Sequence, residues 1–149
     1  MDMQNENIVS DLVFKQLQLD PTNQECFDCA QANPQWASVN NGTFICMNCA
    51  ALHRSMGVHT SFVRSLSMDT WNMGQLKSMA LGGNKSLKEY FQNYDLNDES
   101  VQQRYNTRAA EYYRLNLRSQ CENIPFGDKK PSYEIGREQI PADEVRSAE

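Results

Sequence analysis

A chain of 149 residues with 40% hydrophobic and 22% charged residues has the size and composition of one globular domain. Its net charge of −5 argues against a broadly basic nucleic-acid-binding protein. No apolar run approaches the roughly 18 residues of a membrane span, and the first residues, MDMQNENIVSD, do not resemble a signal peptide. We therefore expect a cytosolic or nuclear protein, whose five cysteines indicate metal ligands rather than disulfides.

The N-terminal part of the sequence predicts a helix followed by a small hairpin. Apolar residues with helical spacing predict a helix over residues 8–17, which ends before Asp20-Pro21. These residues are Ile8, Val9, Leu12, Val13 and Leu17. Segments 36–39 and 43–45 flank Asn40-Asn41-Gly42, where an Asn-Gly step takes positive φ at low cost, so a β-hairpin is expected.

The middle of the chain is predicted to form short helices. A helix is expected over residues 49–56, and residues 58–66 fit either a short strand or a loop. Positive charge is concentrated here, because residues 50–90 carry five Lys/Arg against two Asp/Glu. A solvated face and a binding surface both explain such charge. Asp69 or Thr70 is expected to cap the next helix.

The C-terminal part is predicted to contain three helices and a tail. Asn84, after Gly82-Gly83, can cap the first helix, and the other two are expected over residues 99–105 and 107–118. Residues 122–149 are polar and contain three prolines and two glycines. This composition predicts a flexible tail or linker.

Four of the five cysteines have the spacing of a zinc site. Cys26 and Cys29 form one C-x2-C pair, and Cys46 and Cys49 form another, with 16 residues between the pairs. Four thiolates complete a tetrahedral zinc shell and leave no open coordination position. The sequence therefore predicts a structural zinc ion that holds the hairpin and the following helix together. The remaining Cys121 is expected to be a small buried apolar residue.

Arg54 follows the last of these cysteines by five residues, so a helix that begins at the metal would carry it about one turn away. A rigid mount of this kind can direct one long side chain, and an ion pair with a surface carboxylate is the alternative. Neither His53 nor His59 is assigned as a metal ligand. His53 is expected to pack or to form hydrogen bonds.

The motif C-x2-C-x16-C-x2-C-x4-R, which ends at Arg54, resembles the catalytic domain of the ADP-ribosylation factor (Arf) GTPase-activating proteins. Further similar segments are Asn33-Pro34-x-Trp36-Ala-Ser-Val39, His53-Arg54-Ser-Met-Gly57-Val-His59, Ser61-Phe-Val-Arg64-Ser65, Asp69-x-Trp71, Gly82-Gly83-Asn84 and Tyr105-Asn-Thr-Arg108-Ala109-Ala110. The sequence is most similar to the Golgi-acting members with an N-terminal catalytic domain. The resemblance implies an α+β fold over residues 8–121, in which helices flank a four-cysteine zinc finger and a short β-hairpin or small sheet.

Two alanines depart from the family pattern. Family members often have glycine after the second cysteine and two residues after the fourth, where this chain has Ala30 and Ala51. Alanine is small and favours helix, so we expect activity to be retained with altered local backbone freedom.

The resemblance implies a protein that stimulates GTP hydrolysis by an Arf-family GTPase in its GTP-bound form. Arg54 would be the arginine finger, inserted in trans to stabilise charge on the γ-phosphoryl oxygens. GTP and Mg²⁺ would belong to the partner, and no independent hydrolase activity is expected. The resemblance also implies a cytoplasmic protein of vesicle transport, transiently recruited to Golgi or endosomal membranes by regions outside this chain. Coat proteins are further candidate partners.

Supporting residues have two interpretations each. Trp36 is either a core residue or packs against the arginine finger. Arg64 would support the site by charge or hold its loop, and Asn84 is a helix cap with a second role near the catalytic surface. Asp69 and Arg108 are interpreted as structural, as a cap and an ion-pair partner.

Two other functions remain open. One is a non-catalytic, zinc-stabilised adaptor that binds Arf or a coat protein. The other is a DNA-binding finger similar to the GATA type in cysteine spacing only. Such a finger needs a basic patch to neutralise phosphates, which this acidic chain does not supply, so nucleic acid is not expected as a partner.

Overall fold

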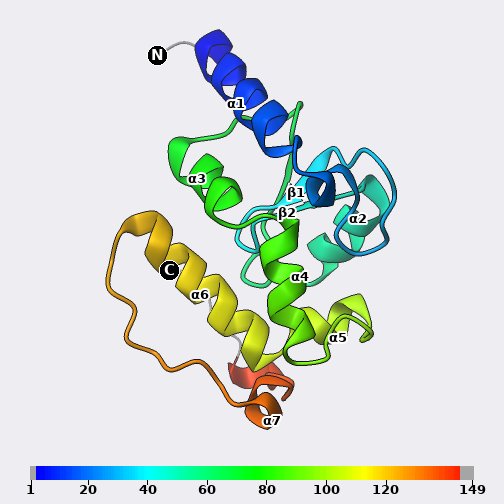
Figure 1. Cartoon of the computed structure of the whole chain (residues 1–149), viewed down its shortest axis with the longest axis vertical. Helices are drawn as coiled ribbons and strands as arrows, with labels where there is room; N and C mark the ends of the chain where they lie inside the picture. Colours follow the sequence, from blue (N-terminus) through cyan, green and yellow to red (C-terminus); the bar gives the residue numbers. More distant parts are fainter. Residues whose placement is uncertain (1–2, 145–149) are drawn as a thin grey trace.

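Three short antiparallel strands form a sheet in the computed structural model, which describes residues 3–144 (Figure 1). The central strand β1 (Trp36–Ser38) pairs with β2 (Thr43–Ile45) on one side and with β3 (Val63–Ser65) on the other. The expected hairpin is therefore confirmed. The segment that fitted either a strand or a loop supplies the third strand of the sheet.

The hairpin turn packs closely against two helices, α3 (Met73–Leu81) and α6 (Arg108–Glu122). Gly42 has a φ of +67°, and a Cβ there would lie 3.1 Å from the side chain of Leu117 and 3.1 Å from the Ser78 carbonyl oxygen. Both the backbone conformation and the close approach therefore require glycine at this turn.

The other helical elements surround the sheet and continue to one end of the molecule (Figure 1). They are α1 (Met3–Leu17), η1 (Pro21–Gln24), α2 (Met47–Ser55), α4 (Asn84–Gln92), α5 (Val101–Tyr105), α7 (Tyr133–Gly136) and η2 (Ala142–Glu144). The α+β class predicted from the sequence is thus confirmed. None of the helices within residues 3–144 is long and apolar enough to cross a bilayer.

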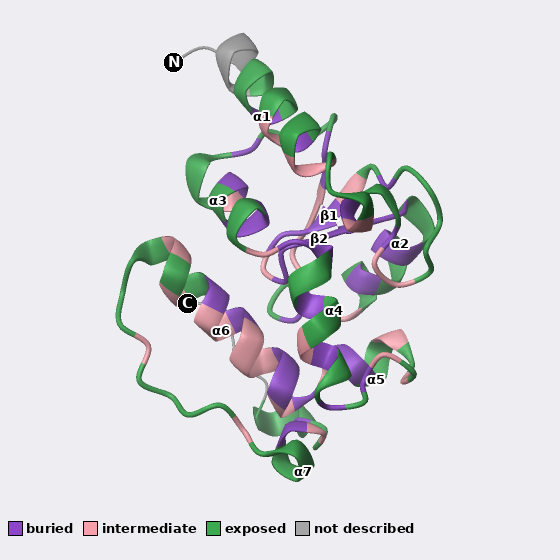
Figure 2. Cartoon of the chain, viewed as in Figure 1, coloured by how far each residue is buried: buried purple, intermediate pink, exposed green. Residues whose placement is uncertain are grey.

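Helix α1 buries less of its surface than its sequence pattern predicts (Figure 2). Ile8 and Leu12, two residues of the predicted apolar stripe, are 57% and 62% exposed. Instead Phe14 is buried, and its ring meets the Trp71 ring edge-on with 4.8 Å between centroids. The periodicity predicted the helix correctly, and α1 contacts the core through Phe14 together with Val13 and Leu17, two residues of the predicted stripe.

The cap of α3 differs from the prediction. Asn72 is the N-cap, because its side chain accepts a hydrogen bond from the Gln75 N–H at 2.8 Å. The Gln75 side chain accepts in return from the Asn72 N–H at 3.0 Å, which completes a capping box. Asp69 instead accepts a hydrogen bond from the Ser65 N–H at 2.7 Å, so it ties down the end of β3.

The segment after α6 runs along the outside of the molecule and returns to it at α7 (Figure 1). There Arg137 donates hydrogen bonds to the Tyr94 carbonyl oxygen at 2.6 Å and to the Glu99 carboxylate at 2.8 Å. Ile140 is buried. Hydrogen bonds and one buried side chain thus attach part of the segment expected to be a tail, although this segment has few apolar residues. Residues 145–149 lie outside the described part.

Two larger apolar clusters form the core of the described residues. One joins α1, the sheet and α3 and consists of Phe14, Ala37, Val39, Phe44, Leu66, Trp71, Leu76 and Met79. The other joins α4, α5 and α6 and consists of Leu87, Phe91, Tyr94, Leu96, Tyr105, Ala109 and Ala110.

Candidate functional site

Four cysteine side chains meet at the N-terminus of α2. Cys26 and Cys29 come from the turn after η1, Cys46 is the N-cap of α2, and Cys49 lies in its first turn. Their sulfur atoms all lie within 4.8 Å of one another. Four sulfurs around a zinc ion are about 3.8 Å apart, given Zn–S bonds of about 2.3 Å. The four thiols are therefore close enough to hold a metal ion with little adjustment.

Burial affects the protonation of this centre. It raises the pKa of the Cys26 thiol to about 11 and also raises the pKa of Cys49. Metal ligands are thiolates, so a metal ion that binds here must displace protons from these groups. Cys46 has a further local role, since its sulfur accepts a hydrogen bond from the Cys49 N–H at 3.4 Å and caps the helix.

The two alanines that depart from the family pattern lie in different backbone conformations. Ala30 follows the second cysteine in the left-handed region, with a φ of +65°. A side chain there costs roughly 1–2 kcal/mol relative to the right-handed conformation. Ala51 lies in α2, where alanine is more favourable than glycine. One departure therefore strains the metal-binding turn, and the other stabilises the helix.

Arg54 lies on α2 and is exposed to solvent. Its guanidinium carbon is 4.8 Å from the centroid of the Trp36 ring, and Trp36 is held in the central strand β1. Among the side chains of residues 7–144 no carboxylate forms an ion pair with Arg54. The surface ion pair considered as an alternative is therefore not formed within these residues, where an aromatic face orients the guanidinium instead.

Arg54 is preceded by a buried histidine with two hydrogen-bond partners. The His53 ring is fully buried and forms a hydrogen bond through Nε2 with Asp28 Oδ2 at 2.6 Å. Nδ1 forms another with the Ser61 hydroxyl at 2.6 Å. This confirms a packing and hydrogen-bonding role for His53. Because both ring nitrogens are engaged, they fix the rotation of α2 about its axis and hence the direction of Arg54.

Asp28 was not identified from the sequence. Its other carboxylate oxygen accepts hydrogen bonds from Arg104 Nη2 at 2.6 Å and from the Tyr105 hydroxyl at 2.9 Å. Burial alone would raise its pKa, but the hydrogen bond and charge of His53 and the charge of Arg104 outweigh burial and lower it. A single carboxylate between two cysteines thus connects the metal-binding turn to α2 and α5. Its position inside a C-x2-C pair was the available sequence signal.

Arg64 lies one strand away from the Trp36 side chain. It belongs to β3, where its neighbour Ser65 pairs with Trp36. Its guanidinium is 3.7 Å from the Asp69 carboxylate and 5.1 Å from the centroid of the Phe62 ring. The side chain is partly exposed. Arg64 therefore stabilises its own loop and leaves part of its charge accessible, and its register opposite Ala37 directs it to the other face of the sheet from Trp36.

Asn84 has neither the position nor the contacts of a surface residue. It is the first residue of α4, preceded by Gly83 at a φ of +97°, so it is not the helix cap. It is 2% exposed, and its side-chain oxygen accepts from the Phe44 N–H at 2.8 Å. Its amide donates to the carbonyl oxygens of Thr22 and Glu25, both at 2.9 Å. Asn84 thus connects α4 to the approach of the metal-binding turn and to β2.

An exposed apolar side chain shares the face of α2 that carries Arg54, and it was not identified from the sequence. Met47, two helical turns before Arg54, is 67% exposed. Leu52 on α2 and Val58 after it are also exposed but do not lie on this face. An exposed apolar residue beside an exposed arginine is typical of protein-binding surfaces.

Comparisons with known proteins agree with this geometry. The ArfGap family profile, described as "Putative GTPase activating protein for Arf", matches residues 11–127. ADP-ribosylation factor GTPase-activating protein 3 of Macaca fascicularis is 43% identical over 108 residues, which are 72% of this chain and 21% of the relative. The corresponding protein GCS1 of Saccharomyces cerevisiae is 42% identical over 117 residues, which are 77% of this chain and 33% of the relative. The chain thus spans only a fifth to a third of the length of these relatives.

Solved structures show the same relationship. The crystal structure of a "putative GTPase activating protein for ADP ribosylation factor" from Cryptosporidium parvum superposes with a TM-score of 0.70 and 32% identity. It covers 81% of this chain and 99% of the other. The ArfGap domain of the HIV-1 Rev binding protein, at 19% identity and a TM-score of 0.57, shares the fold. With most of its length matched by the family profile, the chain belongs to the ArfGap family.

Proposed function

We propose that this chain is a GTPase-activating domain that binds an Arf-family GTPase in its GTP-bound form and inserts Arg54 into the partner's nucleotide site. The observation that carries the proposal is that the Arg54 side chain is exposed and is held in place by its neighbours. Its side chain is exposed and free of carboxylates among the described residues, and the Trp36 ring lies 4.8 Å from its guanidinium carbon. Two hydrogen bonds hold the adjacent His53 ring inside the domain.

The chemistry required of the domain is electrostatic. Charge develops on the γ-phosphoryl oxygens during hydrolysis, and a permanently charged, planar guanidinium can stabilise it through several hydrogen bonds. Arginine fingers contribute rate factors of about 10³ to 10⁵. GTP, Mg²⁺ and the attacking water belong to the partner, so the domain itself forms no intermediate.

The four cysteines would hold zinc, which supplies structural rigidity here rather than catalysis. The cysteines that would bind it are Cys26, Cys29, Cys46 and Cys49. They fix the metal-binding turn against the N-terminus of α2 and so position the helix that carries the arginine. Trp36 would orient the guanidinium before it enters the partner, and Arg64 would add charge at the edge of the contact. Asn84 would support the site indirectly, through its buried hydrogen bonds to β2 and to the residues that lead into the metal-binding turn.

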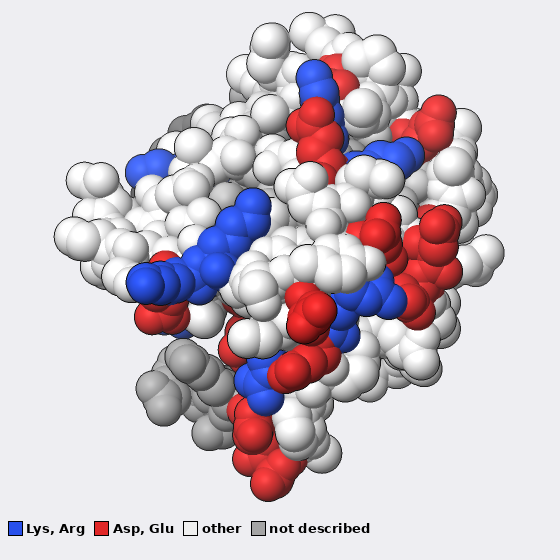
Figure 3. Space-filling model, turned by 60° about the horizontal axis from the view of Figure 1, so that its bottom comes forward, with Lys and Arg blue, Asp and Glu red and all other residues white. Residues whose placement is uncertain are grey.

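The cellular setting is inferred from the family alone. We place the chain in vesicle transport, as a cytoplasmic protein recruited to Golgi or endosomal membranes through regions outside residues 1–149. Coat proteins are candidate partners for those regions. A DNA-binding function finds little support, because the chain has a net charge of −5 and acidic side chains are interspersed with basic ones on the face shown in Figure 3.

The proposal is tested by single-turnover GTP hydrolysis on a soluble Arf lacking its N-terminal helix. Wild type should accelerate hydrolysis, and Arg54→Lys should lose at least 100-fold of that acceleration, since lysine keeps the charge but lacks the planar fork (about 3 kcal/mol). Arg118→Lys, an exposed arginine on α6, is the matched control and should retain full activity.

Three results separate the remaining candidates. Full activity of a folded Arg54→Lys variant would remove Arg54 from the mechanism. Binding of GTP-loaded Arf without any acceleration would favour the non-catalytic adaptor. Absence of both binding and acceleration, in a protein that holds its metal, would overturn the proposed partnership.

A further inference from the structure

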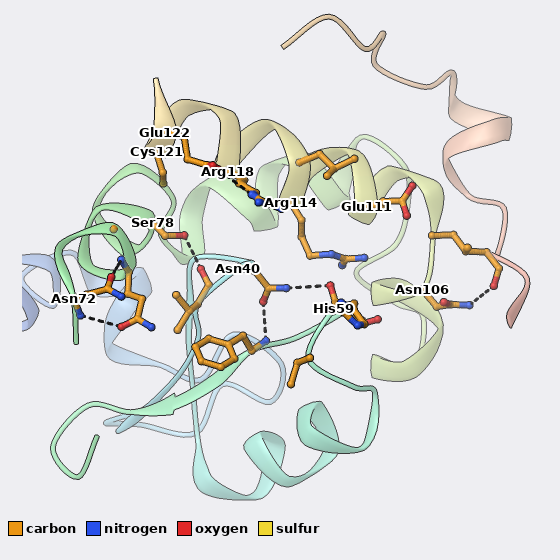
Figure 4. A pocket seen from close by; sticks show the side chains of 18 residues that line it. Asn40, His59, Asn72, Ser78, Asn106, Glu111, Arg114, Arg118, Cys121 and Glu122 are labelled. Atoms are coloured by element: carbon orange, nitrogen blue, oxygen red, sulfur yellow. Dashed lines mark hydrogen bonds and ion pairs between the residues drawn. The ribbon is translucent and has the colours of Figure 1, made fainter. Parts of the chain in front are cut away.

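A cavity of about 970 Å³ lies on the side of α6 that faces the hairpin and the loop after α2 (Figure 4). Its walls are α6, the start of α3 and residues 58–62. The apolar part of the lining consists of Val39, Val58, Phe62, Leu115 and Ile140. The proposed stimulation of a partner GTPase, which depends on Arg54, does not require this cavity.

One buried cation points into the cavity. Arg114 extends from α6 toward the hairpin, as Figure 4 shows, and only 8% of its surface is exposed. No carboxylate among the side chains of residues 7–144 forms an ion pair with it. Burial lowers the pKa of Arg114 to about 10.

The other buried arginine of the domain is treated differently. Arg104 is equally inaccessible, at 6% exposed, but its guanidinium meets the Asp28 carboxylate at 2.6 Å. Buried charges in proteins are normally paired in this way, because an isolated buried charge is unfavourable. Among the described residues, Arg104 therefore has the carboxylate partner that is usual for a buried charge, and Arg114 does not.

The N–H groups of Arg114 that have no partner among the described residues lie on one edge of the guanidinium, and this edge commonly binds oxyanions. Nη1 donates to the Tyr105 carbonyl oxygen at 3.1 Å and approaches Asn41 Oδ1 at 3.4 Å. Nε and Nη2 have no hydrogen-bond partner among the described residues, and neither belongs to the fully enclosed unsatisfied atoms. This Nε–Nη2 edge can bind a carboxylate or phosphate through two parallel hydrogen bonds.

The other charged side chains that line the cavity do not neutralise Arg114 through an ion pair. Arg118 pairs with Glu122 at 3.0 Å, so these two residues balance each other at one end of the cavity. Glu111 is attracted to Arg114 from the preceding turn of α6 without forming an ion pair. The site is therefore one accessible fork of donors beside an apolar wall.

We propose that this cavity binds an organic anion with a phosphate or carboxylate head group on an apolar body, and that Arg114 holds the head group. A soluble metabolite and a lipid with a phosphomonoester head group share this chemistry. The apolar wall distinguishes either of them from free phosphate, which it would not stabilise.

Titration calorimetry with octyl phosphate, octanoate, octanol and inorganic phosphate tests the proposal on the whole chain. The two amphiphilic anions should bind, whereas octanol and inorganic phosphate should bind at least tenfold more weakly. Arg114→Gln should weaken octyl phosphate binding at least tenfold, because a charge-assisted pair of hydrogen bonds is lost.

A second variant keeps the test valid if Arg114→Gln fails to fold. Val58 is 58% exposed at the cavity wall, so Val58→Glu should leave the fold intact and repel the anion, again by about tenfold. Leu19→Glu introduces the same charge at an exposed position that does not line the cavity and should bind like wild type.

Co-sedimentation with phosphatidylcholine vesicles, with and without phosphatidic acid, distinguishes a lipid ligand from a soluble metabolite. Capture that requires phosphatidic acid and Arg114 assigns a lipid, and binding of soluble octyl phosphate alone assigns a soluble anion. The proposal is overturned if octanol binds as tightly as octyl phosphate, if both variants bind octyl phosphate like wild type, or if neither anion nor vesicle binds.

Discussion

The buried residues at the four-cysteine end and at the helical end of this domain differ in kind. The apolar cluster at the first end consists of Cys26, Ile45, Cys46, Cys49 and Ala50, so the candidate metal ligands make up most of it. The cluster at the helical end contains Leu87, Phe91, Tyr94, Leu96 and Tyr105, all with large side chains. The helical end can be stabilised by apolar burial, whereas we expect the end that carries Arg54, with its smaller apolar cluster, to depend on a metal bound by the four cysteines.

Removing one metal ligand should have the largest effect of all. Cys49→Ser should abolish metal binding and the order of α2, and with it all stimulation of GTP hydrolysis, because the thiolates replace a hydrophobic core at this end. Metal content by mass spectrometry, NMR spectra and hydrolysis assays measure this. Cys121→Ser, in α6, is the control and should behave like wild type. A metal-free Cys49→Ser protein with a native NMR spectrum would show that the four-cysteine end does not depend on the metal for its stability.

Asp28 links the two ends, so its loss should affect both. Asp28→Asn leaves the buried Arg104 without its carboxylate partner, and the free energy of unfolding should fall by about 3–5 kcal/mol. The His53 ring also loses a charged partner, so kcat for GTP hydrolysis on Arf should fall more than Arf affinity in protein that remains folded. Urea denaturation and hydrolysis assays provide the two measurements. Glu99→Gln, which removes a partly exposed ion pair with Arg137, is the control and should cost less than about 1 kcal/mol.

A cavity in the helical core should reduce stability without changing the site. Leu87 is fully buried, so Leu87→Ala should lower the free energy of unfolding by about 2–5 kcal/mol. Metal content and the activity of the folded fraction should stay unchanged, as checked by denaturation and hydrolysis assays. Leu81→Ala, at an exposed position, should cost much less. Loss of the metal in Leu87→Ala would show that the two ends are not independently stabilised.

The smallest effects concern the two alanines at the four-cysteine end, and they should have opposite signs. Ala30→Gly should raise the free energy of unfolding by about 1 kcal/mol, because the residue has a φ of +65°. Ala51→Gly should lower it by about 1 kcal/mol, since the residue lies within α2. Thermal denaturation of the metal-loaded protein measures both. Equal effects in the same direction would contradict the assigned backbone conformations.

The sequence by itself determined the elements whose signals are local. The two C-x2-C pairs fix four ligands, Asn41-Gly42 fixes a turn, and a helix beginning at the last cysteines carries Arg54 outward. Each of these depends on residues close together in the chain, so spacing and turn chemistry suffice to predict them. The family pattern added Trp36, which lies against Arg54 in the structure.

Only the tertiary structure decided which residues are buried and which partners they meet. Asp28 contacts Arg104 across 76 positions, and Asn84 reaches Thr22 across 62, so neither contact leaves a local pattern. The same reason explains the partial burial of the apolar stripe of α1 and the different cap of α3. An apolar stripe predicts a helix but not the extent of its burial, and several polar residues before a helix can compete to cap it. That Arg114 has no ion-pair partner among the described side chains is likewise invisible in the sequence, because it depends on which distant carboxylates lie close to it.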